Sequence, residues 1–204
     1  MGGRLVIEDF TMIRTLTAAL IVLAPSFAFA HTGIGDTTGF VHGLGHPVGG
    51  LDHVLPMLAV GLFAAHLGGR AIWLVPLSFV IVMALGGGLG VAGVKVPLVE
   101  IGIGLSGVVL GLAIAFRLNL PTFAAMALVA VFAVFHGHAH GAEMSDTASG
   151  LTYGAGFVCA TALLHAVGVG LGLAIGFAGA SPRIVQVGGG VMALAGVAVL
   201  GGVL

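Results

Sequence analysis

Charged residues are scarce in this sequence. Of its 204 residues, 6% are Asp, Glu, Lys or Arg, whereas 59% are hydrophobic. Soluble domains carry about 25% charged residues, so this chain has too few charges to cover a water-facing surface. We therefore expect an integral membrane protein whose main partner is the lipid bilayer. The formal net charge of −1 supplies no basic surface for binding nucleic acid.

Cysteine is rare in the sequence, and nucleotide-binding motifs are missing. Cys159 is the only cysteine, which excludes an intrachain disulfide and a site built from clustered thiolates. The sequence contains no Walker motif, so we expect neither nucleotide hydrolysis nor a nucleotide partner. We expect no prosthetic group either. Any chemistry must therefore come from the imidazoles and carboxylates that the chain does contain.

The N-terminal segment has the pattern of a secretory signal peptide. A basic Arg14 precedes a short apolar stretch, and residues 28–30 (Ala-Phe-Ala) match the small-residue rule for cleavage. The apolar stretch is shorter than the roughly 20 residues that cross a bilayer. We predict that residues 1–30 are removed and that the mature chain begins at His31. Translation from Met12 and an uncleaved first transmembrane helix remain open alternatives.

Six apolar segments follow, each close to the length of a transmembrane helix. A helix needs about 20 residues to cross the hydrocarbon core, and helices satisfy their own backbone hydrogen bonds there. We therefore predict an all-α integral membrane protein with six transmembrane helices in residues 50–204, preceded by a periplasmic N-terminal segment in residues 31–49. The predicted helices cover residues 50–67, 71–91, 97–116, 121–140, 151–177 and 184–204.

The basic residues between these segments predict the orientation. If the mature N-terminus is secreted, Arg70, Arg117 and Arg183 face the cytoplasm and Lys95 faces outward. This distribution agrees with the positive-inside rule. We predict a multi-pass protein of the bacterial inner membrane with a periplasmic mature N-terminus. Glycines repeated every four residues from Gly168 predict close helix packing. The sequence leaves open whether the protein forms a homo-oligomer.

Histidine and acidic residues gather in two clusters at the predicted outer ends of the first and fourth helices. The first histidine cluster comprises His46, Asp52 and His53, and the second comprises His136, His140 and Glu143. Ionisable groups at membrane depth are costly and mark functional sites. Imidazole suits Ni, Co, Zn and Cu, whereas sites made only of oxygen suit Mg or Ca. The sequence therefore predicts a transition-metal site.

Spacing limits how the first cluster can hold an ion. His46 and His53 are seven residues apart, or about 10.5 Å along a continuous helix, which is too far for two ligands near 2 Å from one ion. Pro47 interrupts a helix at this point. We therefore expect His46 on a bent, metal-binding loop that folds back toward His53. Asp52 can either ligate the ion or orient His53.

The second cluster follows helical periodicity. His136 and His140 are four residues apart and share one helix face, so they can chelate together. Glu143 lies on the same face if the helix continues that far. His138 points elsewhere.

Four further residues are secondary candidates for metal ligands. Cleavage would leave His31 with a free amine beside its imidazole, and His42 lies in the segment before the first cluster. Glu100 is at the outer start of the third predicted helix. His165 lies about 14 residues into the fifth helix, roughly 21 Å from its outer end. At that depth it would serve either onward movement of an ion or packing.

These residues resemble the HupE/UreJ family of nickel or cobalt permeases, which are hydrogenase and urease accessory membrane proteins. The resemblance rests on the first cluster with Pro47, Gly50 and Met57, and on the second cluster with Phe135 and Gly137. It covers essentially the whole mature chain. It implies a permease, not an enzyme, that moves Ni²⁺ or Co²⁺ from periplasm to cytoplasm and binds it through the two clusters. It does not separate nickel from cobalt.

Two other functions fit the same residues. An intramembrane zinc hydrolase needs about three protein ligands, an open water position and a general base such as Glu143 or Asp52. A b-type haem protein needs histidines that face each other across helices. Transmembrane ion flux separates the permease from the hydrolase, and a red purified protein would reveal haem.

Overall fold

A computed structural model describes residues 39–144, 148–177, 179 and 181–203 of the chain. The predicted signal peptide and His31 lie outside this range. The described residues form helices and no strands, which confirms the all-α fold class. The elements are α2 (Phe40–Gly45), the 3₁₀ helix η1 (His46–Gly49), α3 (Leu51–Leu67), α4 (Ala71–Val91), α5 (Val99–Ala115), α6 (Thr122–Glu143), α7 (Ala148–Phe177) and α8 (Pro182–Leu200).

Each predicted apolar segment corresponds to one long helix, from α3 to α8. Four of them, α4, α6, α7 and α8, are long and apolar enough to cross a membrane. Helix α3 has 17 residues, or about 25 Å of length, which falls short of a bilayer core. The pair formed by residues 40–49 and α3, bent by 87°, makes a fifth span if its two parts are counted as one, and is otherwise a re-entrant segment. The chain is thus a multi-pass membrane protein, and six complete spans remain a prediction.

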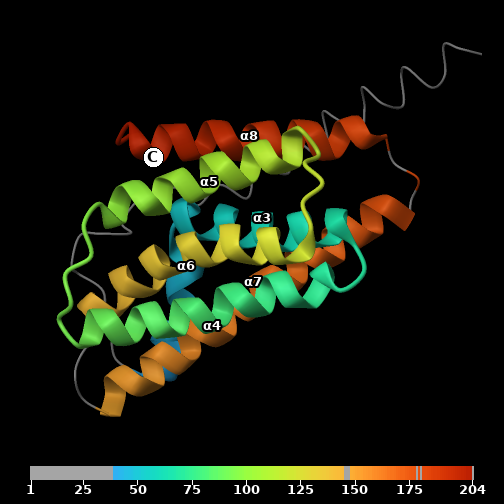
Figure 1. The fold of residues 1–204 in the computed structure, drawn as a ribbon. Coiled ribbons are helices and arrows are strands. Elements are labelled where there is room, and N and C mark those ends of the chain that lie inside the picture. Colours follow the sequence, from blue (N-terminus) through green and yellow to red (C-terminus); the bar gives the residue numbers. More distant parts are fainter. Residues whose placement is uncertain (1–38, 145–147, 178, 180, 204) are drawn as a thin grey trace, which may run out of the picture.

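The helices pack in pairs around α3. Helix α4 lies along α6, α5 lies along α8, and α3 lies along α7 (Figure 1). Helix α3 also contacts α4, α5, α6, α8 and η1. Its side chains Met57 and Phe63 are fully buried, as are Phe79 of α4 and Val129 of α6. This arrangement places the start of α3 beside the end of α6, where the two histidine clusters lie.

Glycines allow the closest of these helix contacts. A Cβ atom on Gly168 of α7 would collide with the backbone of Leu58 in α3, and one on Gly61 would collide with the backbone of His165. A Cβ atom on Gly137 of α6 would collide with the carbonyl of Met83 in α4. Small residues at such positions let transmembrane helices approach closely. The glycines therefore fix the spacing of the helices that carry the candidate site.

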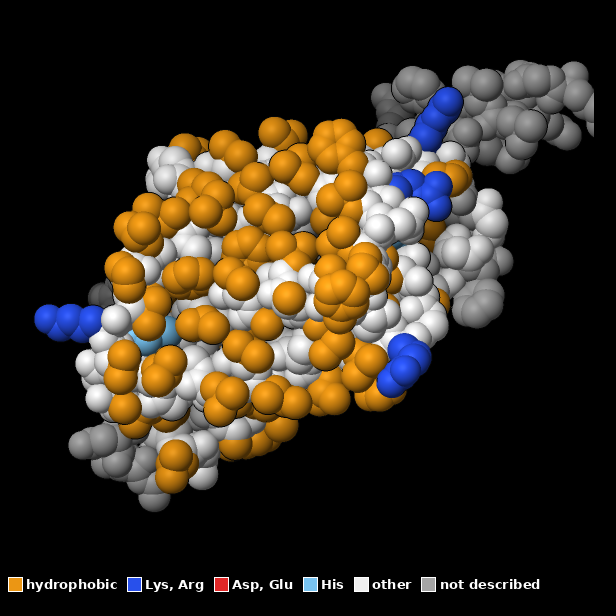
Figure 2. All heavy atoms as spheres, viewed as in Figure 1, with side chains coloured by type: hydrophobic (Ala, Val, Ile, Leu, Met, Phe, Trp, Pro, Cys, Tyr) orange, Lys and Arg blue, Asp and Glu red, His pale blue; other side chains and the backbone are white. Residues whose placement is uncertain are grey.

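The outer surface is largely apolar. Side chains such as Trp73, Leu85, Phe123 and Leu194 are exposed, as expected for residues that face lipid tails. Figure 2 shows hydrophobic side chains across the middle of the molecule and Lys or Arg side chains at its two ends. The orientation that would place the arginine-rich end in the cytoplasm is a prediction.

Candidate metal site

The bend between η1 and α3 brings His46 back toward the helix bundle. His46 is the first residue of η1 and Pro47 follows it at the start of this 3₁₀ helix. The two parts of the bent pair meet at 87°. The ring of His46 lies 6.3 Å from that of His53 and 4.8 Å from that of His140, measured between centroids. The predicted fold-back therefore occurs, although the segment forms two short helices, α2 and η1, where a loop was expected.

Asp52 orients the neighbouring imidazole. Nδ1 of His53 lies 2.9 Å from Oδ2 of Asp52, and the His53 side chain is only 2% exposed. A carboxylate that accepts the Nδ1 hydrogen fixes the tautomer and leaves Nε2 free of its hydrogen, as in many metal-ligating histidines. Of the two roles open to Asp52 in the sequence, this contact favours the orienting one.

His53 meets the second cluster through its other nitrogen. Nε2 of His53 lies 2.6 Å from Nε2 of His140. Two nitrogen ligands at about 2.1 Å from one ion and at a right angle are about 3 Å apart, close to this separation. The structure thus brings together one imidazole from the start of α3 and one from the last turns of α6.

A carboxylate completes the group. His46, His140 and Glu143 each offer one ligand atom, and these atoms all lie within 4.8 Å of one another. His140 and Glu143 come from the end of α6, because the helix continues to Glu143. We call His46, His53, His140 and Glu143 the outer cluster. His46, His140 and Glu143 offer two imidazole nitrogens and a carboxylate oxygen, and His53 adds an imidazole beside His140. Such donors suit a borderline first-row metal ion.

His136 lies one turn deeper and is held by a serine. Its Nε2 is 3.0 Å from Oγ of Ser106 in α5, and its ring is 5.4 Å from that of His53. The Ser106 hydroxyl donates its hydrogen to the carbonyl of Ile103 at 2.5 Å. Since a hydroxyl has one hydrogen, Ser106 accepts from His136, whose Nε2 therefore carries the ring hydrogen. Nδ1 of His136 keeps its lone pair and has no hydrogen-bond partner in the part of the chain that the structure describes.

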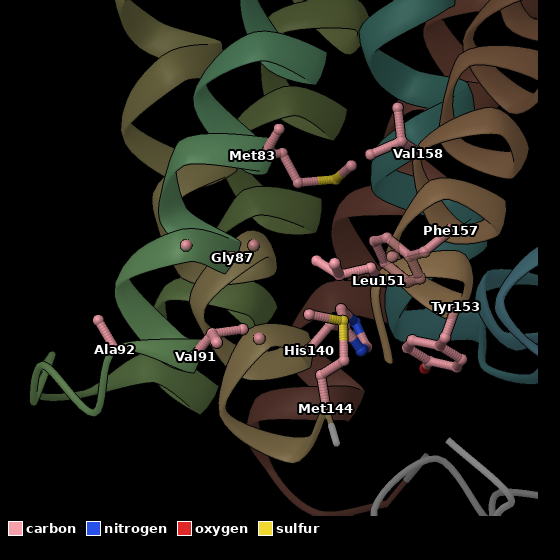
Figure 3. A pocket seen from close by; sticks show the side chains of 15 residues that line it. Met83, Gly87, Val91, Ala92, His140, Met144, Leu151, Tyr153, Phe157 and Val158 are labelled. Carbon is pink, nitrogen blue, oxygen red and sulfur yellow. The ribbon is translucent and has the colours of Figure 1, made fainter. Parts of the chain in front are cut away.

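Aromatic side chains enclose the outer cluster on the α7 side. The ring of Phe157 lies 4.1 Å from that of His140, and the ring of Tyr153 lies 5.7 Å from that of His46. Next to them is a cavity of about 400 Å³ between α4, α6 and α7. Figure 3 shows His140, Met144 and Tyr153 at one end of this cavity and Met83 and Val158 at the other. The cavity gives space beside the outer cluster that extends toward the middle of the bundle.

Of the secondary candidates, the structure describes His42, Glu100 and His165. Glu100 is exposed in the first turn of α5, and His42 is exposed in α2. His165 is buried in α7, 1% exposed, with its ring 5.0 Å from that of Phe79. His138 points elsewhere, as predicted, and its Nε2 is 2.7 Å from the carbonyl oxygen of Val94.

Three contacting residues are absent from the predicted site. Ser106 could have been suspected as a polar residue within an apolar segment, and Tyr153 as the only tyrosine. Nothing in the sequence distinguishes Phe157, because it is one of twelve phenylalanines in the chain. Their roles depend on which helices are neighbours.

Comparison with known proteins gives the family. The family model described as "HupE / UreJ protein" matches residues 18–199 of this chain. The chain belongs to the HupE/UreJ family. It is 46% identical over 193 residues to Protein HupE of Rhizobium leguminosarum bv. viciae, covering 95% of this chain and 99% of that protein. No solved structure matches it.

The match to this HupE/UreJ family confirms the resemblance seen in the sequence. The matched residues include every described helix that contributes to the outer cluster. They also include His31, which lies outside the described residues.

Proposed function

We propose that this HupE/UreJ protein is a permease that takes up Ni²⁺, or Co²⁺, from the periplasm into the cytoplasm. The observation that supports it best is the convergence of His46, His140 and Glu143 within 4.8 Å, with Nε2 of His53 2.6 Å from that of His140. These residues come from separate segments of a multi-pass membrane protein. The ion is the cargo that the outer cluster receives.

The donor set favours nickel or cobalt over the alkaline-earth ions. Imidazole nitrogens bind Ni²⁺ and Co²⁺ well, whereas Mg²⁺ and Ca²⁺ prefer oxygen ligands. Nickel and cobalt differ little in these preferences. Competitive uptake of Ni²⁺ and Co²⁺ is therefore the measurement that decides which ion the protein prefers.

The location follows the predicted topology. We place the outer cluster at the periplasmic face of the inner membrane and the end with Arg70, Arg117 and Arg183 at the cytoplasmic face. The cavity beside His140 would then start near the periplasm and lead inward. Movement through such a path needs no nucleotide.

Uptake into proteoliposomes that contain only this protein tests the proposal. Radioactive Ni²⁺ should accumulate with the wild type, and His53→Ala and His140→Ala should each lower the initial rate about 10- to 100-fold. His42→Ala, which changes an exposed histidine of α2, is the matched control and should keep most of the rate. Wild-type vesicles that take up no more Ni²⁺ than empty vesicles would refute the proposal.

The same preparation separates the alternatives. An intramembrane zinc hydrolase would retain about one zinc ion per chain and show no ion flux. A b-type haem protein would be red when purified. Either result, in the absence of ion flux, would show that the outer cluster serves that other function.

A further inference from the structure

His165 is a buried histidine, and packing alone gives no role to its two ring nitrogens. It is 1% exposed, and neither of its ring nitrogens has a hydrogen-bond partner among the described residues. It lies inside the apolar span Ser149–Gly176 of α7. A neutral imidazole carries one donor and one acceptor, and leaving both unpaired inside a protein costs free energy. Histidines at such positions in membrane proteins mark functional sites.

Neutral side chains of α4 and α7 lie along the same helix contact as His165. Thr161 lies one turn before it, and its hydroxyl donates to Sδ of Met83 at 3.7 Å. Met83 itself lies one turn after Phe79, whose ring meets that of His165 edge-on at 5.0 Å. Imidazole, thioether and hydroxyl therefore follow one another along the α4–α7 contact. Met83 and Thr161 are 2% and 0% exposed.

The cavity extends from the outer cluster to Met83, the side chain that contacts Thr161. Met83 lines one end of the cavity of about 400 Å³, and His140 lines the other (Figure 3). A species that leaves His140 through this space reaches the Met83 sulfur, which is already in contact with Thr161. Among the residues that the structure describes, the cavity is lined by no Asp, Glu, Lys or Arg side chain.

His165 and the outer cluster lie at different depths in the helix bundle. The backbone of His165 packs on Gly61 of α3, eight residues beyond His53, or about 12 Å along the helix. The sequence predicts that His165 lies about 21 Å below the outer end of its own helix. Its depth below His53 is smaller, because α7 starts farther out than α3. At about 12 Å the imidazole still cannot touch an ion bound by His53 and His140 with bonds near 2 Å.

We propose that His165 is a second, transient ligand for the transported ion, reached from the outer cluster through this cavity past Met83 and Thr161. The inference rests on the proposed uptake function and adds a step to it. One imidazole with two weak neutral donors makes a site from which an ion leaves easily, as conduction between sites requires. The outer cluster, with its carboxylate, is the tighter site.

The first test replaces the ring and keeps its packing. His165→Phe preserves an aromatic side chain against Phe79 and removes both unpaired nitrogens. Its melting temperature in detergent should equal or exceed that of the wild type, and equilibrium Ni²⁺ binding at the outer cluster should be unchanged. Initial uptake into proteoliposomes should fall at least fivefold. His138→Phe is the control for loss of a buried imidazole away from the cavity and should keep the uptake rate.

The second test detects the ion at position 165 directly. His165→Cys in a Cys159→Ser background places one thiol in the chain at this depth. Loading it with Co²⁺ should produce a thiolate-to-metal charge-transfer absorption that Cys159→Ser alone lacks. Uptake of Ni²⁺ should recover in part relative to His165→Phe, since a thiolate is also a metal ligand.

The outcomes are distinct. Wild-type uptake by His165→Phe, or a Co²⁺-loaded His165→Cys protein without the thiolate absorption, would make His165 a packing residue and overturn this inference alone. Loss of outer-cluster binding in a stably folded His165→Phe protein would also overturn it. Wild-type vesicles without Ni²⁺ flux would remove the proposed function and this step together.

Discussion

Nε2 of His53 lies 2.6 Å from Nε2 of His140, although the two residues are 87 positions apart in the chain. Both side chains are buried, at 2% and 4% exposure. Because Asp52 accepts the Nδ1 hydrogen of His53, the facing Nε2 carries the lone pair that binds a metal ion. This contact joins the start of α3 to the end of α6 and is the centre of the candidate metal site.

Substitution of Asp52 distinguishes orientation from ligation. In Asp52→Asn the amide oxygen can still accept the Nδ1 hydrogen of His53, so Ni²⁺ affinity should fall only a few-fold. In Asp52→Ala the imidazole loses its acceptor, and affinity should fall about 10- to 100-fold. Equilibrium dialysis with Ni²⁺ measures both. An equal and complete loss in the two variants would instead make Asp52 a direct ligand.

Ser106 should matter although it is not a metal ligand. In Ser106→Ala the Nε2 hydrogen of His136 loses its acceptor in a buried place, which destabilises the fold by about 1–3 kcal/mol. A thermal melt of the purified protein checks this. Ser78 also bonds a carbonyl of its own helix, that of Val75, so Ser78→Ala is the control and should melt near the wild-type temperature. Equal melting temperatures for the two variants would contradict the role of Ser106.

Glycine positions on α7 should differ sharply in tolerance. Gly168→Ala would push a methyl group into the backbone of Leu58, whereas Gly170→Ala meets no atom of the described residues within 4 Å. The first should destabilise the protein by about 1–3 kcal/mol, the usual cost of overpacking. The second should be neutral or slightly stabilising in a helix. Melting curves of the two variants in one detergent make the comparison, and similar values would refute the close α3–α7 contact.

The N-terminus of the mature protein should be His31. Intact-mass measurement or N-terminal sequencing of protein extracted from membranes gives the answer. A retained Met1 or Met12 would show that the predicted signal peptide is not cleaved.

Much of the fold follows from local sequence pattern. Long apolar stretches separated by short polar turns gave the helices, and α4 occupies the predicted residues 71–91 without change. Pro47 marked the bend that returns His46 to the bundle. Both depend on local properties, namely hydropathy and proline stereochemistry, which a sequence carries directly.

The pairing of helices is a different matter. Repeated glycines predicted close contacts but not that Gly61 faces Gly168 in α7. Consequently, the hydrogen bond from His136 to Ser106 and the cavity beside His140 were beyond the reach of sequence pattern. His165 shows the same limit, since its depth relative to His53 depends on where α7 begins beside α3.

A double-mutant cycle on His53 and His140 tests the shared ion most directly. Ni²⁺ affinity would be measured by equilibrium dialysis for the wild type, His53→Ala, His140→Ala and the double variant. If both imidazoles bind one ion, each single change weakens binding about 10- to 100-fold, and the double change adds little, because residues in one network are not additive. Independent effects that multiply in the double variant, in proteins of equal thermal stability, would contradict a common site.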